Sequence, residues 1–347
     1  MIIFQHISMA IGGITLFLLG LKFMSGSMED IAGNKMKSLL KGLTGNRCLG
    51  VLTGAVSTAV IQSSIATNII LVGFVSSGIM TFFEASAVIM GANIGTTITA
   101  QLVSLSGKKV FDITAFGALI AFAGFIIGFI KNAKIKSIGN IMVGFGMIFL
   151  GLDIVNSSVN YFKNYQEFRN IFLVDSDFLL LLNGVLITSI AQSSSAVTSV
   201  MIILASNGLL DFGSAIFLTL GANIGTCVSV IISAIGKPVE ARRTAFFNFA
   251  FNLVGALILF FPLSIFKSEV CLAFQSFSSG VEREIANFHT LFNTFVTIVL
   301  LPILKPFTKL VEIIIPENNV KTKKISAKNG KSTIKIINNA QSIKNTL

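Results

Sequence analysis

Two stretches of the chain carry the same pattern. Residues 54–96 read GAVSTAVIQSSIATNIILVGFVSSGIMTFFEASAVIMGANIGT, and residues 184–226 read GVLITSIAQSSSAVTSVMIILASNGLLDFGSAIFLTLGANIGT. They align without a gap at a shift of 130 residues and are identical at 16 of 43 positions. The identities are mostly small or polar, which chance matching between apolar segments does not explain: Gly54, Thr58, Gln62, Ser63, Ser64, Ala66, Ser76, Gly78, Phe82, Ala85 and the six residues Gly91 to Thr96. The chain therefore contains an internal duplication.

The composition defines the class of protein. Of the 347 residues, 53% are hydrophobic and only 12% are charged, against about 25% charged in an ordinary soluble domain. Residues 48–107 and 178–236 each contain a single charged residue, Glu84 and Asp211, which we interpret as helix-start charges. The polar surface is too small for a soluble globule, so the sequence predicts a polytopic membrane protein. It shows no paired carboxylates at membrane depth, Ser-His-Asp set, phosphate loop or metal cluster, and we predict no enzyme.

Each copy begins with an apolar run that is too short to cross a bilayer. Gln62-Ser63-Ser64 and Gln192-Ser193-Ser194-Ser195 interrupt runs of about 14 residues, which as helices reach roughly 20 Å, short of the roughly 30 Å hydrocarbon core. We therefore predict two re-entrant hairpins with the Gln-Ser-Ser turns at mid-depth.

A second apolar run follows in each copy, at residues 82–106 and 212–236. Gly91–Thr96 and Gly221–Thr226 lie halfway along these runs, and two glycines four residues apart predict a helix that is broken inside the membrane. Close helix packing through glycine is the alternative interpretation.

The predicted fold is all-α, with two inverted-topology membrane repeats at residues 1–136 and 137–287, each with a re-entrant hairpin and a broken transmembrane helix. An extra C-terminal span (288–316) and a basic tail (317–347), predicted to be disordered, follow. First spans are expected at 7–24 and 138–155, and closing spans at 110–130 and 244–266. Basic loops favour a multi-pass protein of the cell (inner) membrane with its N-terminus outside and its tail cytoplasmic, although Lys108 and Lys109 then lie outside.

The turns carry the chemistry of an anion site. The tip of a hairpin exposes the N-terminus of its returning helix, where free N–H groups and the helix dipole favour an anion. Serine hydroxyls and glutamine amides add neutral donors. The candidate anion-binding residues are Gln62, Ser63, Ser64, Gln192, Ser193, Ser194 and Ser195. The alternative is that these side chains only join helices within the membrane.

Neither hairpin contains Lys or Arg, so a bound anion needs another counter-charge, and Na⁺ is the natural candidate. Unwound carbonyls and polar oxygens suit this hard cation. The candidate sodium-binding residues are Asn93, Thr96, Asn223 and Thr226. His289 is expected to be a hydrogen-bonded residue, and Asn248, Asn252 and Asn293 are expected to cap or bridge helices.

The paired Gln-Ser-Ser hairpins, each followed by Gly-Ala-Asn-Ile-Gly-Thr, resemble the type II sodium/phosphate cotransporter family over about residues 1–305. The resemblance implies sodium-coupled phosphate symport, with both Gln-Ser-Ser motifs forming the substrate site. Ala286-Asn-Phe-His289-Thr-Leu-Phe-Asn293 also resembles a family motif, and Ala245-Phe-Phe-Asn248-Phe-Ala-Phe-Asn252 is a partial copy. Two departures stand out: the first motif lacks the third serine found at Ser195, and the tail is too short for the PhoU-like domain of many bacterial members.

The resulting hypothesis is a transporter that couples Na⁺ to inorganic phosphate by alternating access. The expected partners are phosphate, Na⁺ as the coupling ion and membrane lipid, with a homodimer left open, no nucleic acid and no other cofactor. The alternatives are a phosphate exporter, a carrier of another small oxyanion and a non-transporting phosphate sensor.

Overall fold

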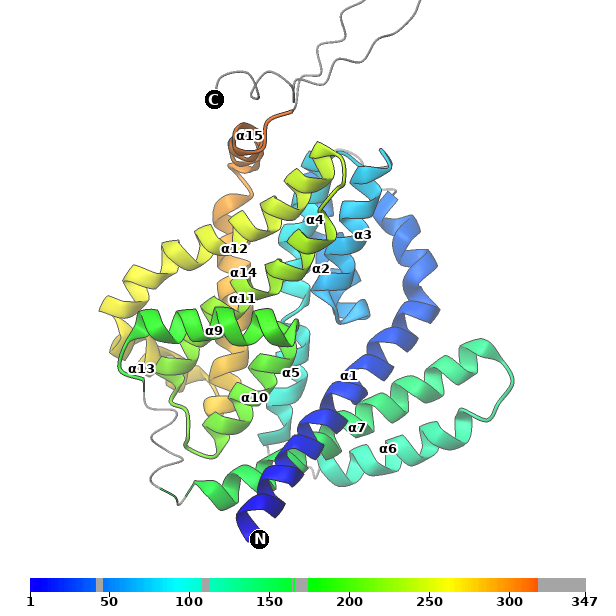
Figure 1. Cartoon of the computed structure of the whole chain (residues 1–347), viewed down its shortest axis with the longest axis vertical. Coiled ribbons are helices and arrows are strands. Elements are labelled where there is room, and N and C mark those ends of the chain that lie inside the picture. The colour runs from blue at the N-terminus through cyan, green and yellow to red at the C-terminus, as the bar shows by residue number, and fades with distance from the viewer. Residues whose placement is uncertain (42–45, 108–112, 164, 166–173, 318–347) are drawn as a thin grey trace, which may run out of the picture.

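A computed structural model describes residues 1–41, 46–107, 113–163, 165 and 174–317. The described residues are helical throughout and form no strand. The elements are α1 (Ile2–Lys41), α2 (Arg47–Ile61), α3 (Ser64–Ser76), α4 (Phe82–Gly95), α5 (Ile98–Val103), a short 3-10 helix (Ser104–Gly107), α6 (Ile113–Ile127), α7 (Ala133–Phe162), α9 (Asp177–Ala191), α10 (Ser194–Ser206), α11 (Phe212–Ser233), α12 (Val239–Ile265), α13 (Lys267–Phe277), α14 (Val281–Leu300) and α15 (Leu304–Ile314) (Figure 1). The predicted tail beyond Glu317, and Lys108 and Lys109, lie outside the described residues.

Several helices are long and apolar enough to cross a membrane. Among the described residues they are α1, the α4–α5 run, α7, α11 and α12, with α14 and α15 qualifying only as a bent pair. The chain is therefore a multi-pass membrane protein. The predicted polar connection at 25–47 is largely helical, because α1 continues to Lys41. The predicted span 110–130 is the shorter helix α6, whereas its counterpart α12 has 27 residues.

The two first spans, α1 and α7, cross in an antiparallel pair (Figure 1). Gly13 lies against Gly151, and Gly20 lies against Gly144, with an added Cβ at Gly20 meeting the Gly144 carbonyl oxygen at 2.7 Å. The absence of a side chain lets the two backbones touch. At the 131-residue shift that aligns the first spans, the Gly13–Gly151 contact becomes the Gly144–Gly20 contact, so the crossing maps onto itself.

Each Gln-Ser-Ser motif forms the turn of a helical hairpin, as the sequence predicts. Gln62 (φ 57°) and Gln192 (φ 53°) end α2 and α9 in the left-handed conformation, the only non-glycine residues with positive φ among those described. Ser63 and Ser193 then cap α3 and α10. The helices of the hairpins have 15 and 13 residues, so each is shorter than a membrane crossing.

The broken helices are the part of the prediction that the structure corrects. In the second copy, α11 runs without interruption through Gly221–Thr226. In the first copy, α4 ends at Gly95 and α5 begins at Ile98, but Thr96 and Thr97 keep near-helical backbone angles. The glycines instead provide room for a neighbour. Gly91 and Gly95 lie against the backbone of α2, as Gly221 and Gly225 lie against that of α9, so helix packing is their role in this structure.

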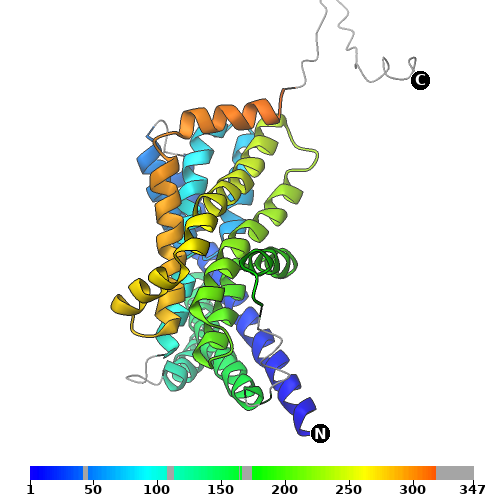
Figure 2. The same cartoon turned by 90° about the vertical axis from the view of Figure 1, so that its left-hand side faces the viewer.

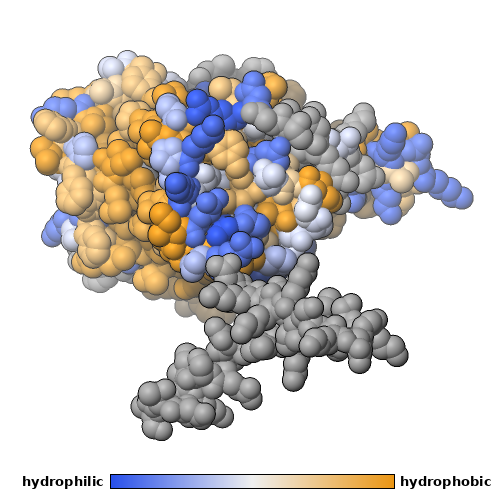
Figure 3. Space-filling view, turned by 90° about the horizontal axis from the view of Figure 1, so that it is seen from above, coloured by the Kyte–Doolittle hydropathy of each residue, from blue (hydrophilic) through white to orange (hydrophobic). Residues whose placement is uncertain are grey.

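The extra C-terminal span is α14, which begins earlier than predicted, and α15 turns away from it by 88° (Figure 2). Arginines bind the carbonyl groups at both ends of α15. Arg47 Nη1 donates to the Leu301 and Pro302 oxygens at 3.1 Å, and Arg243 Nε donates to the Ile315 oxygen at 2.9 Å. Seen from this end, a band of hydrophilic residues lies beside a hydrophobic flank (Figure 3).

Candidate functional site

The two hairpin turns, which are 130 residues apart in the sequence, line one small cavity of about 30 Å³. All seven predicted anion-binding residues line it, and so do two of the predicted sodium-binding residues, Thr96 and Thr226; Ile65 completes the lining. Ser64, Ser194 and Ser195 are buried, and Gln192 is exposed. The fold therefore brings the two copies of the motif together, as the sequence analysis expects.

The first serine of each motif holds the turn in place. Ser63 Oγ accepts a hydrogen bond from the Ala66 N–H at 3.1 Å, and Ser193 Oγ accepts one from the Ala196 N–H at 3.2 Å. These bonds use a hydroxyl lone pair and leave the O–H free to donate. The N–H groups of the first two residues in α3 and α10 have no intrahelical partner because of their position. Two helix N-termini thus present neutral donors to the same cavity.

The hydroxyl contact between the two halves is formed by Thr96 and Ser195, whose oxygens are 3.5 Å apart. Ser195 is the third serine, which the first motif lacks, so this contact has no counterpart from Ile65. The symmetry-related Thr226 Oγ1 instead donates to the Ala222 carbonyl oxygen at 2.9 Å. The Gln62 Oε1 atom is buried without a hydrogen-bond partner in the described part of the chain. The first tip therefore keeps an unused acceptor beside the cavity.

The cavity has no charged side chain in its lining. The described residues also contain no group of three or more His, Cys, Asp or Glu that could hold a metal ion. An anion bound here would be held by neutral donors and helix dipoles, and these arrangements favour an oxyanion of small size. Its charge would need compensation from a mobile cation.

The predicted sodium-binding residues do not lie together. Thr96 and Thr226 line the cavity, but Asn93 and Asn223 lie about one turn earlier on α4 and α11, where both are buried. Asn93 Nδ2 is 3.4 Å from Asn248 Oδ1 on α12, and Asn223 Oδ1 is 3.4 Å from His289 Nε2 on α14. Each repeat thus contacts one copy of the downstream motif.

Sequence reasoning assigned the four downstream polar residues to capping or bridging only. The structure gathers them around Asn93 and Asn223, where Asn248, Asn252, His289 and Asn293 are at most 1% exposed. The available signal was the partial repetition of the Phe-x-x-x-Asn ends of the two downstream motifs, but their partners are far away in the sequence.

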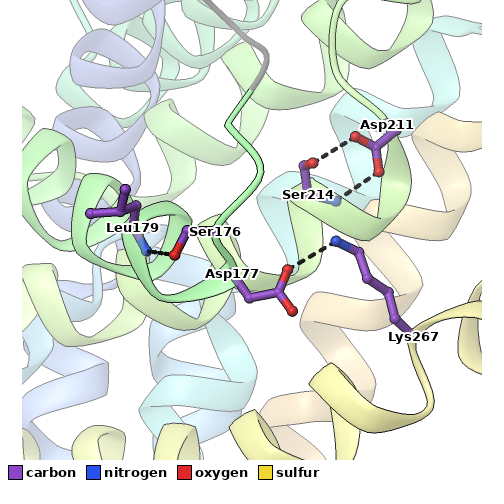
Figure 4. Close-up of polar contacts among 6 residues, drawn as sticks. All are labelled: Ser176, Asp177, Leu179, Asp211, Ser214 and Lys267. Carbon is purple, nitrogen blue, oxygen red and sulfur yellow. Dashed lines mark hydrogen bonds and ion pairs between the residues drawn. The ribbon is translucent and has the colours of Figure 1, made fainter.

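The second hairpin is anchored at one end of the molecule (Figure 4). Lys267 Nζ donates to Asp177 Oδ1 on α9 at 2.9 Å and lies 5.2 Å from the centre of the Phe217 ring. Asp211 caps α11 through the Ser214 N–H at 2.9 Å, which fits its predicted role as a helix-start charge. These contacts tie the start of α9 to α11 and α13.

The fold and the site define a class: a polytopic membrane protein in which two short helical hairpins meet at a polar cavity. The chain matches the family described as Na+/Pi-cotransporter over residues 16–157 and 166–279, and it belongs to that family.

Three relatives illustrate its range. The chain is 26% identical over 305 residues to "Uncharacterized protein YqeW" of Bacillus subtilis (87% of this chain, 96% of the relative). It is 25% identical over 309 residues to "Putative inorganic phosphate export protein YjbB" of Escherichia coli K12 (88% and 55%) and 30% identical over 211 residues to "Sodium-dependent phosphate transport protein 2B" of Pongo abelii (59% and 27%). It thus spans about half of the YjbB relative. No solved structure gives a significant match.

Proposed function

We propose that the protein transports inorganic phosphate across the cell membrane in a sodium-coupled manner, by alternating access around the cavity between the two hairpin turns. The observation that carries the proposal is the convergence of both Gln-Ser-Ser turns on one cavity. Two helix N-termini, serine hydroxyls and glutamine amides would donate hydrogen bonds to phosphate from both halves. The family supports phosphate and Na⁺ as the transported species.

Alternating access would follow from an inverted-repeat architecture. The antiparallel crossing of α1 and α7 through Gly13, Gly20, Gly144 and Gly151 supports it, because a two-fold axis relating the repeats would generate this contact pattern. The equivalent packing of Gly91 on α2 and Gly221 on α9 supports two units of the same internal structure. In this proposal, rocking one repeat against the other would open the cavity to alternate sides.

The orientation has α15 on the cytoplasmic side and the N-terminus outside. Basic residues gather at the α15 end, where Arg47 and Arg243 bind the chain, and Lys305 and Lys309 are exposed. The N-terminus of α1 lies at the opposite end of the molecule (Figure 1). The excess of positive charge on cytoplasmic surfaces favours this direction.

A phosphate exporter is the second candidate, favoured by the similarity to the YjbB relatives. It would use the same cavity, because the direction of net flux depends on ion gradients and gating rather than on the donors that hold phosphate.

The test is uptake of radiolabelled phosphate into proteoliposomes under an inward Na⁺ gradient, compared with an equal K⁺ gradient. Gln192→Ala combined with Ser193→Ala removes donors from one tip, and Ser86→Ala serves as a matched control because its buried hydroxyl bonds only to its own helix, at the Phe82 oxygen. We expect Na⁺-dependent uptake in the wild type and in the control and its loss in the double variant. Folded wild-type protein that moves no phosphate in either direction would refute the proposal.

A further inference from the structure

A cluster of buried polar side chains lies between α4, α11, α12 and α14, beyond the lining of the hairpin cavity. We call it the asparagine cluster, and its members are Asn93, Asn223, Asn248, Asn252, His289 and Asn293. Four of its asparagines share one geometry. Each donates its Nδ2–H to the carbonyl oxygen four residues earlier at 2.9 Å, in the pairs Asn93–Ile89, Asn223–Thr219, Asn252–Asn248 and Asn293–His289. The amide oxygen of each therefore points away from its own helix.

The cluster contains acceptors that no donor satisfies. Asn252 Oδ1, Asn293 Oδ1 and His289 Nδ1 are buried without a hydrogen-bond partner in the described part of the chain. Asn223 Oδ1 can only accept, so the nearby His289 Nε2 is the donor, and Nδ1 carries a lone pair. A buried acceptor without a partner costs about 1–3 kcal/mol, so three of them in one cluster call for an electropositive guest.

Contacts between helices place these acceptors close together. Thr297 Oγ1 bonds to the Met90 oxygen, and Thr290 Oγ1 bonds to Thr97 Oγ1, which fixes an antiparallel register between α14 and the α4–α5 run. That register puts Asn293 level with Asn93 to within one residue. On the other side, Cys227 Sγ contacts both the Asn223 oxygen and Asn252 Nδ2, so Asn252 lies beside Asn223.

We propose that the asparagine cluster is the binding site of the coupling Na⁺, with Asn252 and Asn293 as ligands alongside Asn93 and Asn223. The proposal rests on the proposed function and deepens it. Amide oxygens are hard neutral ligands of the kind that Na⁺ takes, and the absence of carboxylates from the cluster favours a monovalent cation over a divalent one. The site lies on the same helices as Thr96 and Thr226, so its occupation is coupled to the hairpin cavity through α4 and α11.

The experiment measures Na⁺ binding without phosphate. The melting temperature of the purified full chain is followed during titration with NaCl at constant ionic strength, with KCl as the replacement salt. The variants are Asn252→Ala, Asn252→Asp, Asn293→Ala and Asn293→Asp, and Ser86→Ala is again the buried control on α4. We expect each Ala variant to raise the half-saturating Na⁺ concentration by at least about tenfold, since even outer-shell changes at metal sites cost that much.

The aspartate variants separate a ligand from a purely structural residue. A carboxylate oxygen coordinates Na⁺, so the Asp variants should keep the Na⁺ response and should be stabilised most when Na⁺ is present. If the asparagines only bridge helices, an uncompensated buried carboxylate is more harmful than Ala, and the half-saturating Na⁺ concentration stays unchanged in every variant that folds. That result would overturn the site, and so would a wild type without a Na⁺-specific shift. Na⁺ binding without phosphate transport would instead refute the proposed function and keep the site.

Discussion

Replacing Gly221 by alanine tests the packing that positions the second hairpin. An added Cβ would collide with the Leu181 carbonyl oxygen of α9 and would lie 2.8 Å from the Val185 nitrogen. Ordinary contacts between such atoms are about 3.5–4.0 Å, so α9 must move by at least about 0.7 Å. Both atoms belong to a backbone and cannot rotate away. Overpacking of this kind costs about 3 kcal/mol at the upper end of its usual range, and alanine regains about 1 kcal/mol of helix propensity, which leaves a net loss of about 2 kcal/mol.

The matched control is Gly73→Ala on α3, because nothing lies within 4 Å of an added Cβ there. The two variants therefore share the chemical change and the gain in helix propensity but differ in the collision. Thermal unfolding in detergent should show Gly221→Ala clearly below the wild type and Gly73→Ala at or above it. Because α9 carries Gln192, phosphate uptake by Gly221→Ala should also fall. Equal melting temperatures for the two variants would refute the packing of α9 on α11.

Three further outcomes are expected. Gly208→Ala should cost about 1–2 kcal/mol of stability, measured by thermal unfolding, because Gly208 has φ +71° and alanine is strained there even though the space around it is open; a neutral effect would contradict this backbone conformation. Lys267→Met should lower stability by about 1 kcal/mol, because it breaks the 2.9 Å ion pair with Asp177, and the Asp177→Asn, Lys267→Met double variant should lose less than the sum of the single losses. Arsenate, a near-isostere of phosphate, should compete for uptake in a cavity of neutral donors, whereas succinate should not, and equal competition by both would argue against an oxyanion cage.

The hairpins were predictable because their signals are local. A serine that caps a helix acts within three residues, as Ser63 does on the Ala66 N–H, and a short apolar run limits the length of α2 and α9. The membrane class followed from composition alone. The same local reasoning predicted Glu84 as a helix-start charge, and the structure shows it in a capping box with Thr81.

The rest could not be read from the sequence because it depends on distant partners. Glycines inside an apolar run are compatible with either a broken helix or a close contact, and the α9 segment that decides the question for Gly221 lies about 40 residues upstream. The roles of Asn252 and Asn293 depend on how α12 and α14 pack beside α11 and α4, respectively. Their spacing within one helix indicates only that they lie one turn from Asn248 and His289.

The central claim is that the two repeats meet at one cavity through which phosphate passes, and a reversible cross-link tests it most directly. Thr96 and Ser195 belong to different repeats, and their hydroxyl oxygens are 3.5 Å apart, so cysteines at both positions can approach disulfide geometry. In a background with Cys48, Cys227 and Cys271 replaced by serine, Thr96→Cys combined with Ser195→Cys should cross-link under oxidation, lose Na⁺-dependent phosphate uptake and recover it on reduction. Unimpaired uptake by fully cross-linked protein would contradict the account, as would failure of the two cysteines to form a disulfide in folded, active protein.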